Sequence, residues 1–79
     1  MKIPRDLNGK YLVEVLCRHW DYQIVHQQGS HIILDTESPC HQRLSIPNHN
    51  PLRLGTLNSI LRAVASHKGV SKVDVINTF

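Results

Sequence analysis

The stretch Gln28-Gly29-Ser30-His31-Ile32-Ile33-Leu34 combines a glycine turn with a histidine at the start of an apolar strand. An imidazole exchanges protons near neutral pH, so His31 can serve as a general base or a general acid. Gly29 would let a phosphate backbone come close, and Ser30 can offer it a hydroxyl or a backbone N–H. The stretch therefore indicates acid/base chemistry centred on His31.

RNA is a substrate that such a site could cleave, because the ribose 2′-hydroxyl is a built-in nucleophile. Cleavage needs mainly a base for that hydroxyl, an acid for the leaving oxygen and donors around the phosphorane charge. One positioned histidine contributes on the order of 100- to 10,000-fold in rate. That contribution suits a slow ribonuclease better than a digestive one.

Two other site chemistries find less support. A metal site of imidazole and thiolate ligands could be assembled from His26, His31, His41, His49 and Cys40. The spacing of these residues matches no standard ligand pattern. Cys17 and Cys40 form no spaced pair, which is typical of free thiols, and no serine or cysteine lies in a recognisable nucleophile elbow. We expect neither a metal ion nor a cofactor.

Positive charge is concentrated in the second half of the chain. The net charge is only +3, but no acidic residue lies between Ser38 and Val73. Such a segment suits a polyanion or an acidic protein partner, and an ordinary solvated surface is the other interpretation. The cations that we expect to attract phosphate are Lys10, Arg43 and Arg53.

The first predicted elements are a helix and a hairpin. Asn8 can cap a helix that runs to about His19, with Leu12, Val15, Leu16 and Trp20 at the spacing of one buried stripe. Residues 22–27 and 31–35 favour strands, and Gln28-Gly29 offers a two-residue turn between them. With that loop, His26 would face His31 across the hairpin, and a longer loop would change the register.

The rest of the chain predicts a strand and two helices. The strand covers residues 42–46 and ends at Pro47. A helix that starts near Leu54 and ends at Gly69 would bury Leu57, Ile60, Leu61 and Val64. Ser71 and Asp74 resemble a capping box for a short last helix, whose candidate buried residues are Val73, Ile76 and Phe79.

This order predicts an α+β domain in which a three-stranded antiparallel sheet carries both main helices on one face and leaves the other open. His31 alternates with Ile32 and Leu34, so its side chain should lie on the open face. Ile24 and Ile33 would share that face as an apolar patch that a partner could cover.

The length of 79 residues suits a single domain, which we expect to span residues 1–79. No apolar run is long enough to cross a membrane, and Met1 to Arg5 does not resemble the start of a secretory signal. We expect a cytoplasmic protein with no membrane partner.

Three segments carry a family resemblance: Gln28 to His31, Ser45 to His49 and Leu54 to Leu61. In this order and spacing they resemble the HicA family of toxins, small messenger-RNA interferases of toxin–antitoxin pairs with a double-stranded-RNA-binding-domain-like fold. The resemblance covers about residues 7 to 66. It implies that His31 is the catalytic histidine, and that a HicB-type antitoxin blocks the site. Members often carry a second histidine directly after the first, where this chain has Ile32.

We therefore expect a metal-independent endoribonuclease toxin in which Gly29 and Ser30 shape the approach of RNA to His31. Duplex RNA would ordinarily be gripped by basic residues, and the chain has no dense lysine cluster, so single-stranded messenger RNA is the expected substrate. A non-catalytic RNA-binding module of the same fold is the alternative, and a domain that binds only an acidic protein is the third hypothesis.

Overall fold

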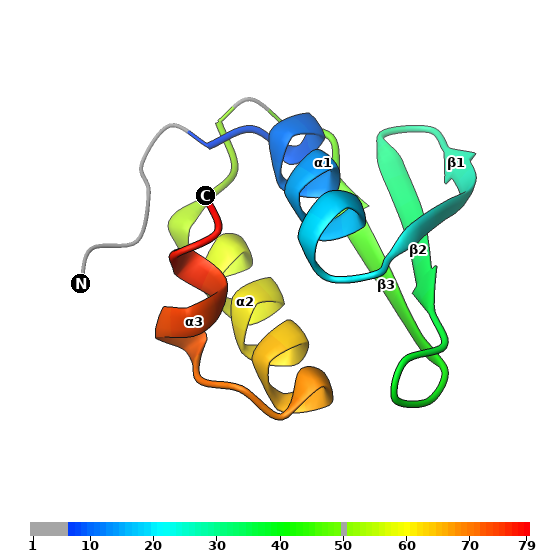
Figure 1. The fold of residues 1–79 in the computed structure, drawn as a ribbon. Coiled ribbons are helices and arrows are strands. Elements are labelled where there is room, and N and C mark those ends of the chain that lie inside the picture. The colour runs from blue at the N-terminus through cyan, green and yellow to red at the C-terminus, as the bar shows by residue number, and fades with distance from the viewer. Residues whose placement is uncertain (1–6, 50) are drawn as a thin grey trace.

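The computed structural model describes residues 7–49 and 51–79 of the chain. The elements, in order, are α1 (Gly9–His19), β1 (Gln23–Gln28), β2 (His31–Thr36), β3 (Gln42–Pro47), α2 (Leu54–Lys68) and α3 (Lys72–Ile76) (Figure 1). This is the predicted α+β fold, with the α-β-β-β-α order of double-stranded-RNA-binding-domain-like proteins and a short helical tail. Residues 1–6 of the predicted domain lie outside the described residues.

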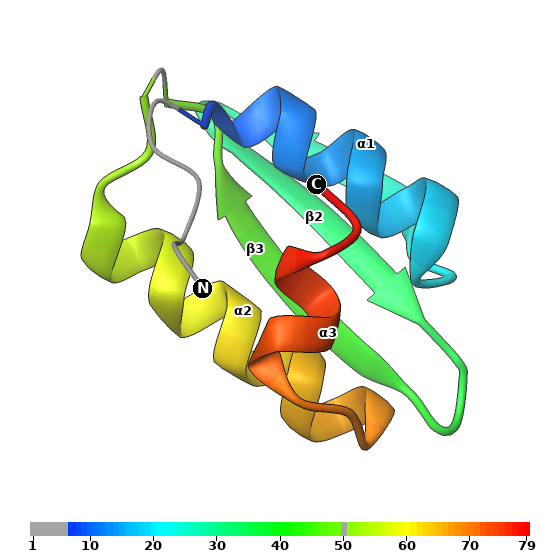
Figure 2. The same cartoon turned by 60° about the vertical axis from the view of Figure 1, so that its left-hand side comes forward.

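The three strands form one antiparallel sheet in the order β1-β2-β3. Both α1 and α2 lie on the same side of this sheet (Figure 2). Strand β2 shows the resulting alternation, because Ile32 and Leu34 are buried whereas His31 is exposed. The prediction of one covered and one open sheet face is confirmed.

The core lies between the sheet and the two long helices. The predicted stripe of α1 is buried at Leu12, Val15 and Leu16, and Trp20 packs against the core from its edge. All four predicted core residues of α2 are buried as well. Asn8 caps α1 by accepting a hydrogen bond from the backbone N–H of Tyr11 at 2.7 Å, as its residue type predicts.

The helical tail packs against α2, on the side of that helix that faces away from the sheet (Figure 1). Ser71 and Asp74 form the predicted capping box. The prediction that Val73 is buried is wrong, because the box fixes the start of α3 so that Val75 and Ile76 face the core while Val73 faces solvent. Beyond α3, Trp20 Nε1–H donates to Thr78 Oγ1 at 3.0 Å, and this bond joins the tail to α1.

Candidate functional site

The turn before His31 is one residue later than the sequence suggested. Gln28 pairs with His31, so the two loop residues are Gly29 and Ser30, and the predicted pairing of His26 with His31 is wrong. Gly29 has a φ of 59°. Hairpin turns of type II′ require a positive φ at the first loop position, where only glycine is free of steric cost. The position of Gly29 therefore sets the register.

A β-bulge in β1 changes which side chains share a face. The register shifts between Ile24 and His26, so that Ile24 pairs with Leu34 and His26 pairs with Ile33. Without the extra residue, Ile24 would lie on the same face as His26. With it, Ile24 lies on the side of the helices, so the predicted open-face patch of Ile24 and Ile33 is wrong.

His31 lies in the middle strand of the uncovered sheet face. Directly paired with it are Gln28 of β1 and Pro47 of β3. The next row on the same face consists of His26, Ile33 and Ser45. His31 is exposed, as are Gln28 beside it in β1 and Ser45 in the next row of β3, whereas Pro47 is half-buried. The imidazole is thus open to a ligand lying across the strands.

Backbone hydrogen bonds join the turn to the end of β3, and the end of β3 to the start of α1. The N–H of Asn48 donates to the carbonyl oxygen of Ser30 at 2.6 Å, and the N–H of Gly9 donates to that of His49 at 2.9 Å. A Cβ on Gly9 would lie 2.1 Å from the carbonyl oxygen of Pro47, so only glycine permits this approach.

Sequence reasoning did not assign a role to Gly9 or Asn48. Asn48 lies within one of the segments that carry the family resemblance, which was the available signal. For Gly9 the signal was a glycine in the first turn of a helix, where it lowers helix stability and so calls for a packing reason.

The expected phosphate-binding cations do not gather around His31. Lys10 lies on the helix side of the sheet, where it lines a hollow of about 370 Å³ together with Glu14, Gln27 and Asn48. Arg53 is exposed immediately before α2. Only Arg43 shares the open face with His31.

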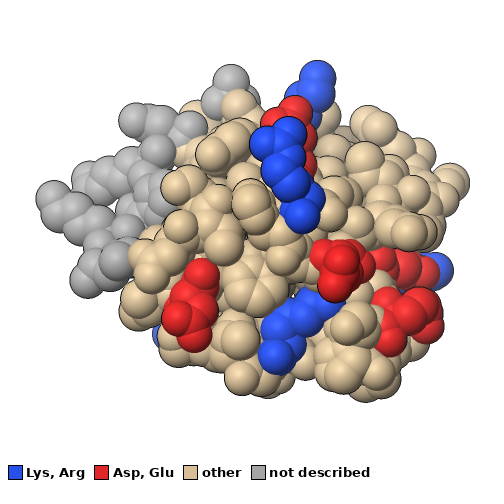
Figure 3. Space-filling view, in the orientation of Figure 1, with Lys and Arg blue, Asp and Glu red and all other residues tan. Residues whose placement is uncertain are grey.

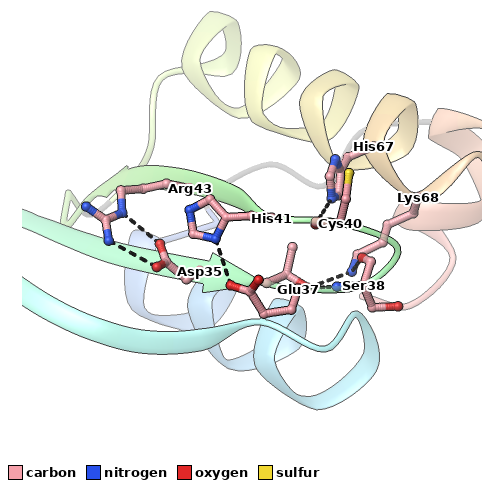
Figure 4. Close-up of polar contacts among 9 residues, drawn as sticks. Asp35, Glu37, Ser38, Cys40, His41, Arg43, His67 and Lys68 are labelled. Atoms are coloured by element: carbon pink, nitrogen blue, oxygen red, sulfur yellow. Dashed lines mark hydrogen bonds and ion pairs between the residues drawn. The ribbon is translucent and has the colours of Figure 1, made fainter.

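Arg43 is engaged by an acid. Its Nε and Nη2 donate to the two carboxylate oxygens of Asp35 at 2.8 and 3.0 Å (Figure 4). Chiefly through this hydrogen bonding, Arg43 holds the pKa of the Asp35 carboxyl below its ordinary value. The pair lies four residues along β2 from His31, or roughly 13 Å at the rise of a strand. Arg43 is therefore a neutralised cation at the far end of the face.

His41 and Cys40, two of the residues considered for a metal site, lie near that far end as well. His41 Nδ1 contacts Glu37 Oε2 at 2.7 Å, and His67 Nε2 contacts the carbonyl oxygen of Cys40 at 2.8 Å (Figure 4). Across residues 7–49 and 51–79, no three His, Cys, Asp or Glu side chains come together as a possible metal site. The five residues considered from the sequence do not form such a group.

Charges on the visible surface are mixed. In the orientation of Figure 1, acidic side chains lie between the lysines and arginines, with uncharged surface around them (Figure 3). Nor is any described helix both long and apolar enough to cross a bilayer.

Comparison with known families supports the resemblance of the three segments. Residues 9–65 match the family described as the HicA toxin of bacterial toxin–antitoxin systems. No curated protein and no solved structure matches the chain. The match covers the turn, all three strands, the whole of α1 and most of α2. The chain therefore belongs to the HicA family of bacterial toxin–antitoxin toxins.

Proposed function

We propose that this HicA-family chain is an endoribonuclease that cleaves single-stranded messenger RNA in the cytoplasm by histidine acid/base catalysis. The observation that supports the proposal is the place of His31, exposed in the central strand of a sheet face that no described element covers. A ribose-phosphate chain lying across the three strands would pass directly over this imidazole.

The reaction asks little of the protein beyond proton transfer and positioning. His31 takes the proton of a ribose 2′-hydroxyl or delivers one to the leaving oxygen. The hairpin turn of Gly29 and Ser30 has no side chain larger than a hydroxymethyl group, so the RNA backbone can approach the start of β2. Neither step requires a metal ion or a cofactor.

The three cations contribute differently to binding of the RNA backbone. Lys10 lies near the turn, because it lines the same hollow as Asn48, whose N–H holds Ser30. We assign Lys10 to attraction of the RNA backbone and Arg53 to a more distant contact. Arg43 contributes less, since Asp35 cancels its charge.

We propose that an antitoxin inhibits the toxin by covering the open face of its sheet. A HicB-type antitoxin that lies over β2 would bury His31 and the half-buried Ile33 in one contact. Inhibition and shielding of the sheet would then be the same event.

An RNA digest tests the proposal. Wild type and the variants His31→Gln and His19→Gln are incubated with a long messenger, with and without a chelator. His19 is exposed at the end of α1 and serves as the histidine control. We expect cleavage by wild type and His19→Gln in both conditions, and a loss on the order of 100-fold or more for His31→Gln. Full cleavage by His31→Gln, or salt-sensitive binding without any products, would contradict the nuclease proposal.

A further inference from the structure

We propose that His26 is a second catalytic histidine of this site, and that His26 and His31 divide the two proton transfers of RNA cleavage between them. The inference rests on the proposed ribonuclease activity and deepens it. It is carried by the position of two exposed histidines on one uncovered sheet face.

The pairing of β1 with β2 places His26 on that face. Gln27 pairs with the buried Ile32 and lines the hollow beside α1, so its side chain lies on the helix side. Neighbouring strand residues alternate between faces, which puts His26 and Gln28 on the open side with His31. The following residue of β2 cannot serve, because Ile32 is in the core. The second histidine of the face therefore comes from the adjacent strand.

The spacing of the two histidines suits a phosphodiester. His26 pairs with Ile33, two residues beyond His31, so the two histidines are diagonal neighbours. The backbone positions of diagonal neighbours on one face are roughly 7–8 Å apart, a distance that aromatic and long side chains can span. In the described part of the chain, neither imidazole forms a hydrogen bond with another protein group. The charged side chains that the three strands place on this face are the paired Asp35 and Arg43, and Glu37 pairs with His41 just beyond them.

The chemistry benefits from two proton-transfer groups. The 2′-oxygen forms a bond to phosphorus and gives its proton to one imidazole, while the bond from phosphorus to the 5′-oxygen breaks and that oxygen takes a proton from the other, protonated imidazole. The products are a 2′,3′-cyclic phosphate and a free 5′-hydroxyl. Entering and leaving oxygens lie on opposite sides of phosphorus, so two rings on one diagonal can flank it, whereas a single ring fixed on a strand would have to move.

The test uses two RNA oligonucleotides with the same sequence. One has its natural linkage at the position that wild type cleaves, and the other has sulfur in place of the bridging 5′-oxygen there. A thiolate leaves without a proton, so the sulfur linkage makes a general acid unnecessary. The proteins are wild type, His26→Gln, His31→Gln and the control His19→Gln, each checked for an unchanged thermal unfolding midpoint.

We expect His26→Gln to cleave the natural oligonucleotide on the order of 100-fold more slowly than His19→Gln. The sulfur linkage should restore the rate of one histidine variant, the one that lacks the acid, and leave the other slow. Natural-linkage cleavage by His26→Gln at the control rate, or restoration of both variants or of neither, would overturn the role of His26. The underlying nuclease proposal fails separately, if wild type leaves RNA intact or His31→Gln is fully active.

Discussion

The backbone N–H of Asn48 donates a hydrogen bond of 2.6 Å to the carbonyl oxygen of Ser30. This contact joins the end of β3 to the hairpin turn that precedes His31. The next residue, His49, accepts the N–H of Gly9, so the first turn of α1 belongs to the same junction. The turn before the candidate catalytic strand is thus tied directly to the end of β3 and, through it, to the start of α1.

Replacing Gly9 should disturb this junction. In Gly9→Ala the new Cβ would meet the carbonyl oxygen of Pro47 at 2.1 Å, and α1 would have to move away from β3. We expect a loss of about 1–3 kcal/mol in the free energy of unfolding, measured by urea denaturation. The control is Gly55→Ala in α2, where a Cβ meets nothing within 4 Å and helix propensity should give a gain of about 0.5–1 kcal/mol. Equal stability of the two variants would show that the close approach of Pro47 does not require glycine at position 9.

Removing the carboxylate of Asp35 from the open face should strengthen RNA binding. In Asp35→Asn the guanidinium of Arg43 loses its carboxylate partner and becomes available to phosphate. We expect tighter binding of single-stranded RNA and a slope of log affinity against log salt that is steeper by about 0.7, the value for one additional phosphate contact. Titrations at several salt concentrations measure both quantities. An unchanged slope in Asp35→Asn would mean that RNA does not reach this end of the sheet.

Stability at alkaline pH should report the burial of Tyr22. Burial raises the pKa of Tyr22 to about 12, whereas an unfolded tyrosine ionises near its ordinary value of 10. Between these values the unfolded chain loses this proton and the native state keeps it, so the free energy of unfolding falls as pH rises from 10 to 12. We expect Tyr22→Phe to reduce this fall, and Tyr11→Phe, at an exposed position, to retain it.

At neutral pH the same Tyr22→Phe variant should lose about 1 kcal/mol, because the phenol no longer donates to Gln42 Oε1. Urea denaturation at neutral pH and at several alkaline values gives both effects. An alkaline fall of the same steepness in Tyr22→Phe and wild type would assign the titration to other groups.

The tail beyond the family match should contribute to stability. Val75 is fully buried and lies outside the matched residues 9–65, whereas Val73, two residues earlier in the same helix, is 45% exposed. We expect Val75→Ala to lower the free energy of unfolding by about 2 kcal/mol through lost burial and a residual cavity, and Val73→Ala to change it by less than about 0.5 kcal/mol. Thermal or urea unfolding compares the pair. A similar small effect in both would show that α3 folds independently of the core.

The sequence by itself determined the elements and the face on which His31 lies. Helical spacing of Leu57, Ile60, Leu61 and Val64 specified α2, and the alternation of His31 with Ile32 specified an open and a covered side of β2. These patterns are local, since helix and strand periods relate residues only a few positions apart. The segments around Gly29, Pro47 and Leu54 likewise indicated the HicA family.

Only the tertiary structure decided the neighbours of His31. The bulge between Ile24 and His26 and the position of Gly29 in its turn each move the register by one residue, and one residue decides which side chains are paired. The pairing of Arg43 with Asp35 joins two strands, and the contact of Gly9 with Pro47 joins a helix to a strand. No local period encodes such long-range contacts, because they arise when separate elements pack against one another.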